Sequence, residues 1–259
     1  MSSVIIQHLR RYYDDLICAG SVLTRFPVGR FANKQTPWDL ARSTWCWPLY
    51  GAVIGALSAG LFLLLKLCGA SSLLAAPWVV LCQIFLTGGL HEDGLADTMD
   101  GLGSGKDTAT KLTIMRDSRI GSFGALALLL YIAIRVTALA TLPDRAIFPA
   151  LAISATLARA GMPILVTFCP AARPDGLAKQ LTGLSKDRML SSLFCAFCLA
   201  LLLLPHTIAF LACALTLGLV VLMRYQTLRH LNGFTGDILG ATVCCVEAAT
   251  LTLFALLLT

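Results

Sequence analysis

Residues 189–223 read MLSSLFCAFCLALLLLPHTIAFLACALTLGLVVLM. This apolar run has 35 residues, whereas one membrane-spanning helix needs about 20. Pro205 and His206 interrupt it, and a proline inside a helix removes a hydrogen bond and clashes with the preceding turn. We therefore expect two spans here, a short one over Met189–Leu204 and a second one that ends near Met223.

Other apolar runs approach the length of a span on either side of this one. They are Pro48–Leu67, Ser72–Leu90, Phe123–Leu142, Ile147–Phe168 and Ile238–Leu258. Hydrophobic residues make up 57% of the chain and charged residues 13%, about half the charged fraction of a soluble domain. The sequence predicts an all-α, polytopic helical membrane protein with about seven transmembrane helices, in a single integral membrane domain over residues 1–259.

The lysines and arginines predict the orientation of this protein. With seven spans, 16 of the 20 fall on the side of the N-terminus, and only Lys66 and Arg145 fall on the other side. The 16 are Arg10, Arg11, Arg25, Arg30, Lys34, Arg42, Lys106, Lys111, Arg116, Arg119, Arg173, Lys179, Lys186, Arg188, Arg224 and Arg229. Positive residues collect on the cytoplasmic side of a membrane. We expect a cytoplasmic N-terminus, and we attribute the net charge of +6 to topology rather than to nucleic-acid binding.

The segment before the first span, residues 1–47, is predicted to be a cytoplasmic arm. Within it, Ile5–Leu23 has an amphipathic pattern. Two interpretations stay open. The segment lies along the membrane surface as an amphipathic helix, or it packs as a helix against the cytoplasmic end of the protein.

The densest charge lies in residues 88–124, GGLHEDGLADTMDGLGSGKDTATKLTIMRDSRIGSFG. This segment holds six of the 14 carboxylates of the chain. Asp93, Asp97 and Asp100, which we call the acidic stripe, are spaced i, i+4, i+7 and so fall within an arc of ~60° on one face of a helix. Charge this dense in an apolar chain indicates a bound cation. We interpret residues 91–122 as an acidic cytoplasmic catalytic loop, with the active site on that side.

The acidic stripe suits a hard divalent cation, Mg²⁺ or Mn²⁺, because carboxylate oxygens are the ligands that these ions prefer. We expect Leu90–Leu102 to continue the second span past the membrane surface as a helix. Gly94 and Gly101 border the stripe and leave room for a bulky ligand. His91 lies on another face of this helix, where a supporting or structural role is expected. The alternative for the whole segment is a solvated acidic helix end.

A candidate phosphate site follows the stripe. The residues before the third span read RDSRIGSFG, from Arg116 to Gly124. Two arginines, a hydroxyl and a glycine-flanked helix start are the groups that bind phosphate oxygens. The alternative is a positively charged topology anchor with Ser122 as a helix cap, and Arg116 and Arg119 can serve both roles.

A second polar cluster, NGFTGDILGA at residues 232–241, precedes the last span. Asp237 sits there at a helix start, and we expect it to meet the acidic stripe at one cytoplasmic site. Glu247 lies inside the span, where a carboxylate is either functional or paired. Arg135 and Arg159 are its candidate partners, and a purely structural ion pair remains an equal alternative.

Three strings in this order resemble one family of enzymes: HEDGLADTMDG at 91–101, IMRDSRIGSFG at 114–124 and GFTGDILGA at 233–241. The family is that of the adenosylcobinamide-GDP ribazoletransferases, also called cobalamin synthases. LTRFPV at 23–28 and PLYG at 48–51 resemble it too, so the likeness covers essentially the whole chain. It implies a membrane-embedded, Mg²⁺-dependent transferase. Such an enzyme joins adenosylcobinamide-GDP to α-ribazole or its 5′-phosphate and releases GMP, the final nucleotide-loop assembly step of cobalamin biosynthesis.

The resemblance also implies residue roles. The metal ligands would be Asp93, Asp97, Asp100 and Asp117, and Arg116 and Arg119 would hold diphosphate oxygens. Asp237 would be a further ligand or the group that accepts the ribose proton, and His91 is a weaker candidate for that base. The remaining substrate contacts expected are Ser118, Gly94, Gly101, Thr235, Gly236 and Arg159.

Two other classes stay open. A Mg²⁺-dependent membrane phosphotransferase of the CDP-alcohol phosphotransferase type also carries aspartates at helix ends, but in a different pattern from DG-x-AD-x2-DG. A cation transporter would need acidic residues within its spans, where only Glu247 qualifies. Partners expected beside the substrates and the bilayer are other cobalamin-assembly enzymes or further copies of the chain. Gly51-x3-Gly55 is a candidate helix-packing face, within one chain or between two.

Overall fold

The structure is a computed structural model that describes residues 2–32, 38–105 and 107–258. Lys34 and Lys106, two of the 16 residues in the charge count, lie outside these ranges. Over the described part of the chain the regular structure is helical, apart from one isolated β-bridge. The prediction of an all-α fold is therefore confirmed.

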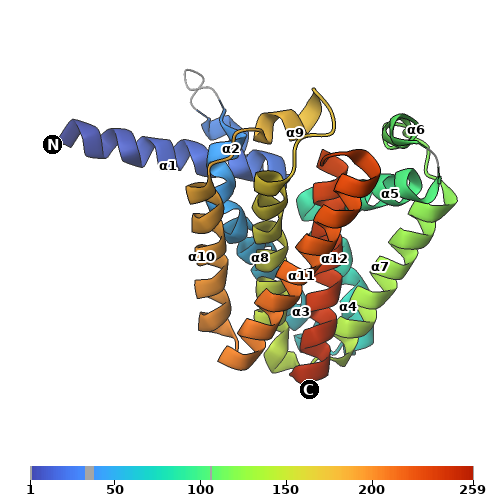
Figure 1. Cartoon of the computed structure of the whole chain (residues 1–259). Helices are drawn as coiled ribbons and strands as arrows, with labels where there is room; N and C mark the ends of the chain where they lie inside the picture. Colours follow the sequence, from blue (N-terminus) through green and yellow to red (C-terminus); the bar gives the residue numbers. More distant parts are fainter. Residues whose placement is uncertain (1, 33–37, 106, 259) are drawn as a thin grey trace.

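Long helices stand side by side in a bundle (Figure 1). They are α3 (Trp47–Leu67), α4 (Ser72–Thr87), α7 (Ser122–Thr141), α8 (Asp144–Phe168), α10 (Lys186–Leu203), α11 (His206–Leu231) and α12 (Gly236–Leu257). The other elements are α1 (Ser2–Leu23), α2 (Leu40–Ser43), α5 (Leu90–Gly103), α6 (Thr108–Ile114), α9 (Gly176–Leu181) and the 3-10 turns Pro27–Phe31 and Thr44–Cys46. The chain breaks at Pro205, between α10 and α11, as predicted.

Five of the described helical segments are long and apolar enough to cross a membrane. They are Leu40–Leu67, which ends in α3, together with α7, α8, α11 and α12. A sixth is counted only if α4 and α5 are taken together as one bent span. The protein is therefore a multi-pass membrane protein with five or six candidate spans. α10 falls outside this count, because its 18 residues begin with the charged Lys186, Asp187 and Arg188.

The second predicted span does not continue straight into the acidic segment, and this expectation was wrong. Gly88 and Gly89 both adopt a left-handed conformation with φ of 71°, which a residue with a side chain rarely adopts. The backbone N–H groups of both glycines bond back to the carbonyls of Ile84 and Phe85, which closes the end of α4. The chain then turns by 92° into α5. The acidic stripe accordingly lies on a separate helix.

α8 is the centre of the bundle, because almost every residue from Ala146 to Val166 is buried. α3 packs against it through Gly51 and Gly55. A Cβ at Gly51 would lie 2.3 Å from the carbonyl oxygen of Ala155, and a Cβ at Gly55 would lie 2.2 Å from that of Leu151. The packing face formed by these two glycines is thus used within the chain, where only glycine lets the two backbones approach so closely.

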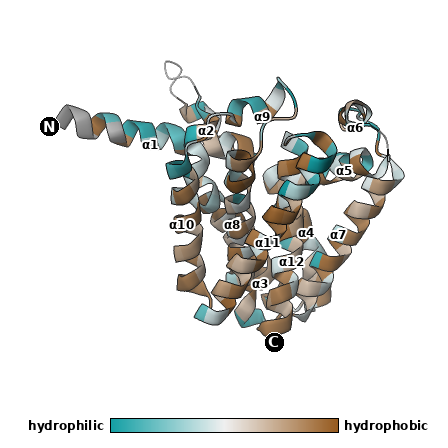
Figure 2. Ribbon diagram, viewed as in Figure 1, coloured by the Kyte–Doolittle hydropathy of each residue, from teal (hydrophilic) through white to brown (hydrophobic). Residues whose placement is uncertain are grey.

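The polar elements gather at one end of the bundle, opposite the C-terminus. α2, α9, α5 and α6 lie at that end, and α1 projects sideways from it (Figure 1). Hydrophilic residues concentrate there, whereas the upright helices are largely hydrophobic (Figure 2). The inner part of α1 is anchored by Asp15, which is buried and accepts a hydrogen bond from Nε of Arg42 at 2.5 Å.

Candidate active site

α5 and α12 cross at two glycines. A Cβ on Gly94 would lie 2.7 Å from the carbonyl oxygen of Asp237, and a Cβ on Gly240 would lie 3.1 Å from that of His91. Real Cβ contacts essentially never fall below 3.0 Å, so Gly94 is required for this approach. The crossing places the acidic stripe beside the start of α12. The prediction that these two segments meet is confirmed.

Asp97 is the carboxylate most affected by this packing. We treat α5 as lying outside the spans, because it turns away from α4 and carries the acidic stripe. Burial, Asp93 and Asp237 together raise the pKa of Asp97 to about 7. Like charges near a half-buried carboxylate disfavour its ionised form, and a bound cation reverses that effect. The electrostatics around Asp97 therefore favour cation binding.

Asp237 is held in place by Arg173. Nη1 of Arg173 lies 3.4 Å from Oδ2 of Asp237, and its Nη2 donates to the carbonyl of Leu112 at 2.8 Å. The loop carrying Arg173 is tied to the loop before α12 by two backbone hydrogen bonds of 2.8 Å, between Phe234 and residues 170–172. α12 is capped by Thr235, whose hydroxyl accepts from the backbone N–H of residue 238.

A cleft of about 530 Å³ opens between α5 and the loop that precedes α7. Asp93 and Asp97 line it from α5, and the loop contributes residues 115–120. The predicted phosphate site and two members of the acidic stripe thus face the same space. Gly101, which was expected to make room for a ligand, instead packs against Met115, since a Cβ there would lie 2.5 Å from Cγ of Met115.

The charged loop residues are paired in the structure. Arg119 donates from Nε and Nη2 to both carboxylate oxygens of Asp117, and this lowers the pKa of Asp117 to about 2. Nη2 of Arg116 lies 2.5 Å from Oδ1 of Asp175. Both arginines are largely exposed, with Arg119 at 87%. They are free to exchange these surface partners for an anion in the cleft, because exposed ion pairs contribute little stability.

Asp100 has a different task from Asp93 and Asp97. Its two carboxylate oxygens accept hydrogen bonds from the backbone N–H groups of Gly121 at 2.7 Å and of Gly124 at 2.8 Å. It therefore satisfies the exposed donors at the start of α7 and joins α5 to that helix. Asp100 is not among the residues that line the cleft with Asp93 and Asp97, and its metal role stays a prediction.

Arg159, which was expected to contact substrate, lies in the interior instead. It is 1% exposed and forms an ion pair with Glu247. Arg135 forms a second ion pair with the same carboxylate at 3.3 Å and donates to the hydroxyl of Tyr131 at 2.7 Å. The predicted pairing of Glu247 with both arginines is confirmed, and it accounts for three charges inside the bundle.

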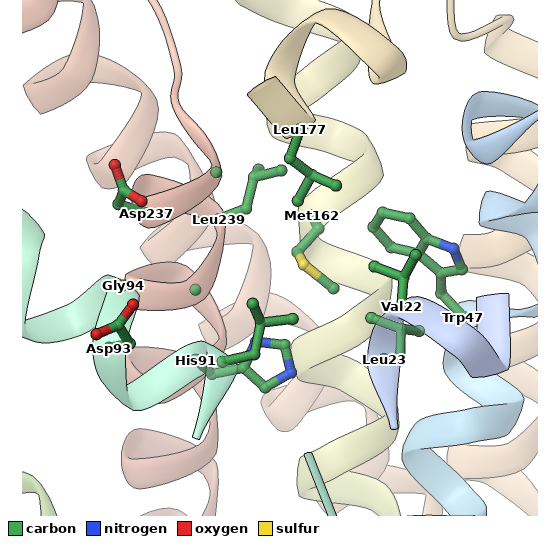
Figure 3. Close-up of a pocket in the computed structure, with 13 residues that line it drawn as sticks. Val22, Leu23, Trp47, His91, Asp93, Gly94, Met162, Leu177, Asp237 and Leu239 are labelled. Atoms are coloured by element: carbon green, nitrogen blue, oxygen red, sulfur yellow. The ribbon is translucent and has the colours of Figure 1, made fainter. Parts of the chain in front are cut away.

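A second cavity, of about 140 Å³, lies on the other side of α5. Asp93, Asp237 and Gly236 line it near the crossing, and His91 forms part of its wall (Figure 3). Burial and the nearby guanidinium of Arg159 lower the pKa of His91 to about 3, so its imidazole is a weak base at neutral pH. This argues against His91 as the group that accepts the ribose proton.

Comparison with known proteins decides the family. Residues 15–255 match the sequence pattern of the family described as cobalamin-5-phosphate synthase. The chain belongs to the cobalamin-5-phosphate synthase family. The adenosylcobinamide-GDP ribazoletransferase of Bradyrhizobium diazoefficiens is 38% identical over 236 residues, 90% of each chain. Those of Azorhizobium caulinodans and Sinorhizobium medicae are 39% and 38% identical and cover 87% and 96% of this chain, and 88% and 98% of their own. No solved structure shows a significant match.

The resemblance to this family implied a Mg²⁺-dependent enzyme, so the donor groups of the site must be compared with those that Mg²⁺ prefers. Within the described ranges, no three His, Cys, Asp or Glu side chains are arranged as a ready-made metal site. Mg²⁺, however, is usually bound by one or two carboxylates together with substrate phosphates rather than by a complete protein cage. Asp93 and Asp97 in the cleft, with Asp237 beside them, provide the right donor chemistry for that mode.

Two features of this site were missed by the sequence analysis. Arg173 was counted only as a positive residue, and no motif around it indicates that it reaches Asp237. The apolar residues of the smaller cavity come from α1, α3, α5, α8, α9 and α12, most of them far apart along the chain. The resemblance of residues 23–28 to the family was the available signal for part of that cavity, since Leu23 lines it.

Proposed function

We propose that this chain joins adenosylcobinamide-GDP to α-ribazole, or to α-ribazole 5′-phosphate, with release of GMP. The relatives named for this reaction match the chain over most of its length. The observation that carries the proposal is the cleft in which Asp93 and Asp97 face Arg116 and Arg119. A site for two phosphates and a divalent cation requires this combination of charges.

The reaction transfers a phosphoryl group. A ribose hydroxyl oxygen of α-ribazole forms a bond to the phosphorus on the cobinamide side of the diphosphate. The bond from that phosphorus to the bridging oxygen breaks, and GMP leaves with this oxygen. The hydroxyl proton passes to a carboxylate. Asp237 is the candidate, because it lines the smaller cavity from which an acceptor would approach and is not one of the two carboxylates assigned to Mg²⁺.

The residues of the cleft would divide the remaining tasks. Asp93 and Asp97 would hold Mg²⁺, which when bound offsets the negative charge that develops on the phosphate oxygens. Arg119 and Arg116 would leave Asp117 and Asp175 to bind the diphosphate, since guanidinium groups bind phosphate oxygens in a bidentate manner. Ser118 lines the same cleft and would donate its hydroxyl to a phosphate oxygen.

The orientation in the membrane is part of the proposal. The charge count supports a cytoplasmic N-terminus and, because the polar elements lie at one end of the bundle, a site open to the cytoplasm. The bilayer would be the inner membrane of a bacterium, and α10 would be the seventh span. Association with other cobalamin-assembly enzymes or with further copies of the chain is compatible with this arrangement.

The test is release of GMP by the purified full-length protein given adenosylcobinamide-GDP, α-ribazole and Mg²⁺. Reactions without α-ribazole or with EDTA are the controls, because transfer needs the acceptor whereas simple hydrolysis does not. We expect GMP and the joined corrinoid in equal amounts, and both should depend on the metal. No product with fully folded protein, or equal GMP release without α-ribazole, would refute the proposal.

A further inference from the structure

The smaller cavity beside the crossing of α5 and α12 is polarised. In Figure 3, Asp93 and Asp237 lie at one end, and Trp47 and Leu23 lie at the other. Met162, Leu177 and Leu239 also line it, so most of its wall is apolar. A ligand that fits must therefore carry a hydrophobic group at one end and polar groups at the other.

The size of this cavity limits the choice of ligand. Its volume is about 140 Å³. A protein cavity of about 150 Å³ lined by aliphatic and aromatic side chains binds benzene. A corrin ring is several times too large. Guanine has polar groups along its edges, which this apolar wall would leave without partners at a cost. A benzene ring fused to a small heterocycle, as in the base of α-ribazole, is the least polar of these groups, and its benzene ring has the size that such a cavity accepts.

His91 supplies an independent observation. It is 3% exposed and lines the cavity, and its buried Nε2 has no hydrogen-bond partner among the described residues. A buried polar atom left unsatisfied is costly, so it indicates a partner that arrives from outside. The ring nitrogen of a benzimidazole that does not carry the ribose is a hydrogen-bond acceptor. The imidazole N–H of His91 can donate to it.

The cavity also has the right position relative to the cleft. Asp93 lines both spaces. A nucleoside whose base points towards Trp47 would therefore extend its ribose towards Asp93 and Asp237. In this position a ribose hydroxyl reaches the boundary with the cleft, where the diphosphate would lie.

We propose that this cavity is the acceptor site, in which Leu23, Trp47, Met162, Leu177 and Leu239 enclose the benzimidazole of α-ribazole and His91 donates a hydrogen bond to its free ring nitrogen. His91 is thereby a specificity-determining residue rather than a base. The inference rests on the proposed function for the identity of the nucleoside. The cavity itself points to the chemical class, an aromatic group with a hydrogen-bond acceptor and a polar substituent.

One experiment fills the cavity. Leu177→Phe adds volume from α9, where the residue is only partly buried, and Leu190→Phe on the outer face of α10 is the matched control. The Michaelis constants for α-ribazole and for adenosylcobinamide-GDP are measured separately. Leu177→Phe should raise KM for α-ribazole about tenfold or more and change KM for the corrinoid less than about twofold. An equal rise in both constants, or no rise for α-ribazole, would overturn the assignment.

A second experiment tests His91 without depending on volume. The wild type is compared on α-ribazole and on the corresponding α-riboside of dimethylindole, which lacks the acceptor nitrogen. It should prefer α-ribazole about fivefold or more in kcat/KM, and His91→Phe should lose that preference. A preference that persists in His91→Phe would overturn the role of His91.

Equilibrium dialysis of α-ribazole against the full-length protein, without the corrinoid, separates this inference from the proposed function. Binding that Leu177→Phe weakens and Leu190→Phe does not would support the acceptor site even if no GMP were released. Transfer by the wild type with unaltered α-ribazole binding in Leu177→Phe would leave the proposed function standing and refute the acceptor site.

Discussion

Replacing Gly94 by alanine should damage the active site through a single methyl group. The new Cβ would lie 2.7 Å from the carbonyl oxygen of Asp237 and 3.2 Å from Cα of Gly240, whereas ordinary contacts begin at 3.4 Å. Both neighbours are backbone atoms, so no side chain can rotate away. α5 and α12 must separate by about 0.7 Å at the crossing, and overpacking of this kind costs about 1–3 kcal/mol of folding free energy.

The effect on catalysis should exceed the effect on stability. The separation moves Asp93 and Asp97 relative to Asp237, and a displacement of about 1 Å in an active site costs about 100-fold in rate. We expect Gly94→Ala to lower kcat between about tenfold and 100-fold, with a modest fall in Tm. The assay is GMP release at saturating substrates, with the Tm of each variant measured in the same detergent.

Two further glycine substitutions serve as comparisons for Gly94→Ala. Gly60→Ala in α3 places its methyl group where no atom of the described part of the chain lies within 4 Å, and it should leave kcat unchanged. Gly101→Ala meets mainly the flexible side chain of Met115, so its cost should lie between the two. Wild-type kcat in Gly94→Ala would show that the crossing does not position the carboxylates, and our account of the site would be wrong.

Four other predictions follow from the charged groups. Asp97→Asn should abolish GMP release. It should not lower Tm in metal-free buffer at pH 8, because the substitution removes a carboxylate that its neighbours repel. Activity restored by saturating Mg²⁺ would exclude Asp97 as a ligand. The Mg²⁺ concentration for half-maximal rate should rise as pH falls below about 7, since protonated Asp97 does not bind the ion, and a pH-independent value would contradict this. Arg119→Lys should lower kcat/KM about tenfold at an unchanged charge, and a normal rate would make Arg119 only a topology anchor. Glu247→Ala should lower folding stability by about 3 kcal/mol or more, measured as Tm, whereas an unchanged Tm would mean that the two arginines need no counter-charge.

The sequence predicted features that depend on local pattern. The break at Pro205, the helical acidic segment and the pairing of Glu247 with arginines all follow from apolar runs, residue spacing and the cost of charge in a membrane. The direction of α5 did not follow, because Gly88 and Gly89 permit a sharp turn without specifying its angle. The separation of Asp100 from Asp93 and Asp97 depends on where α7 begins in space.

The acceptor site and the contact of Arg173 with Asp237 could not be predicted from the sequence, for a similar reason. The cavity is assembled from helices that are distant in the chain, and each of its apolar residues reads as ordinary core or lipid-facing surface. Arg173 reaches Asp237 only because two loops pair through backbone hydrogen bonds, which leave no side-chain signature. The spacing of residues along one helix follows from the sequence, whereas contacts between loops can be predicted only when the fold is known.

The ion pairs of Glu247 constrain how this protein is made. Arg159 precedes its partner by 88 residues, and Arg135 precedes it by more. A chain synthesised from its N-terminus brings both arginines into the lipid before α12 exists, and an unpaired arginine in a membrane helix costs about 2.5–3.5 kcal/mol on insertion scales. The arginines of α7 and α8 therefore gain their counter-charge only when α12 has been inserted. A chain truncated before α12 would be retained poorly by the bilayer and exposed to membrane proteases, so completion of synthesis and stable insertion are coupled.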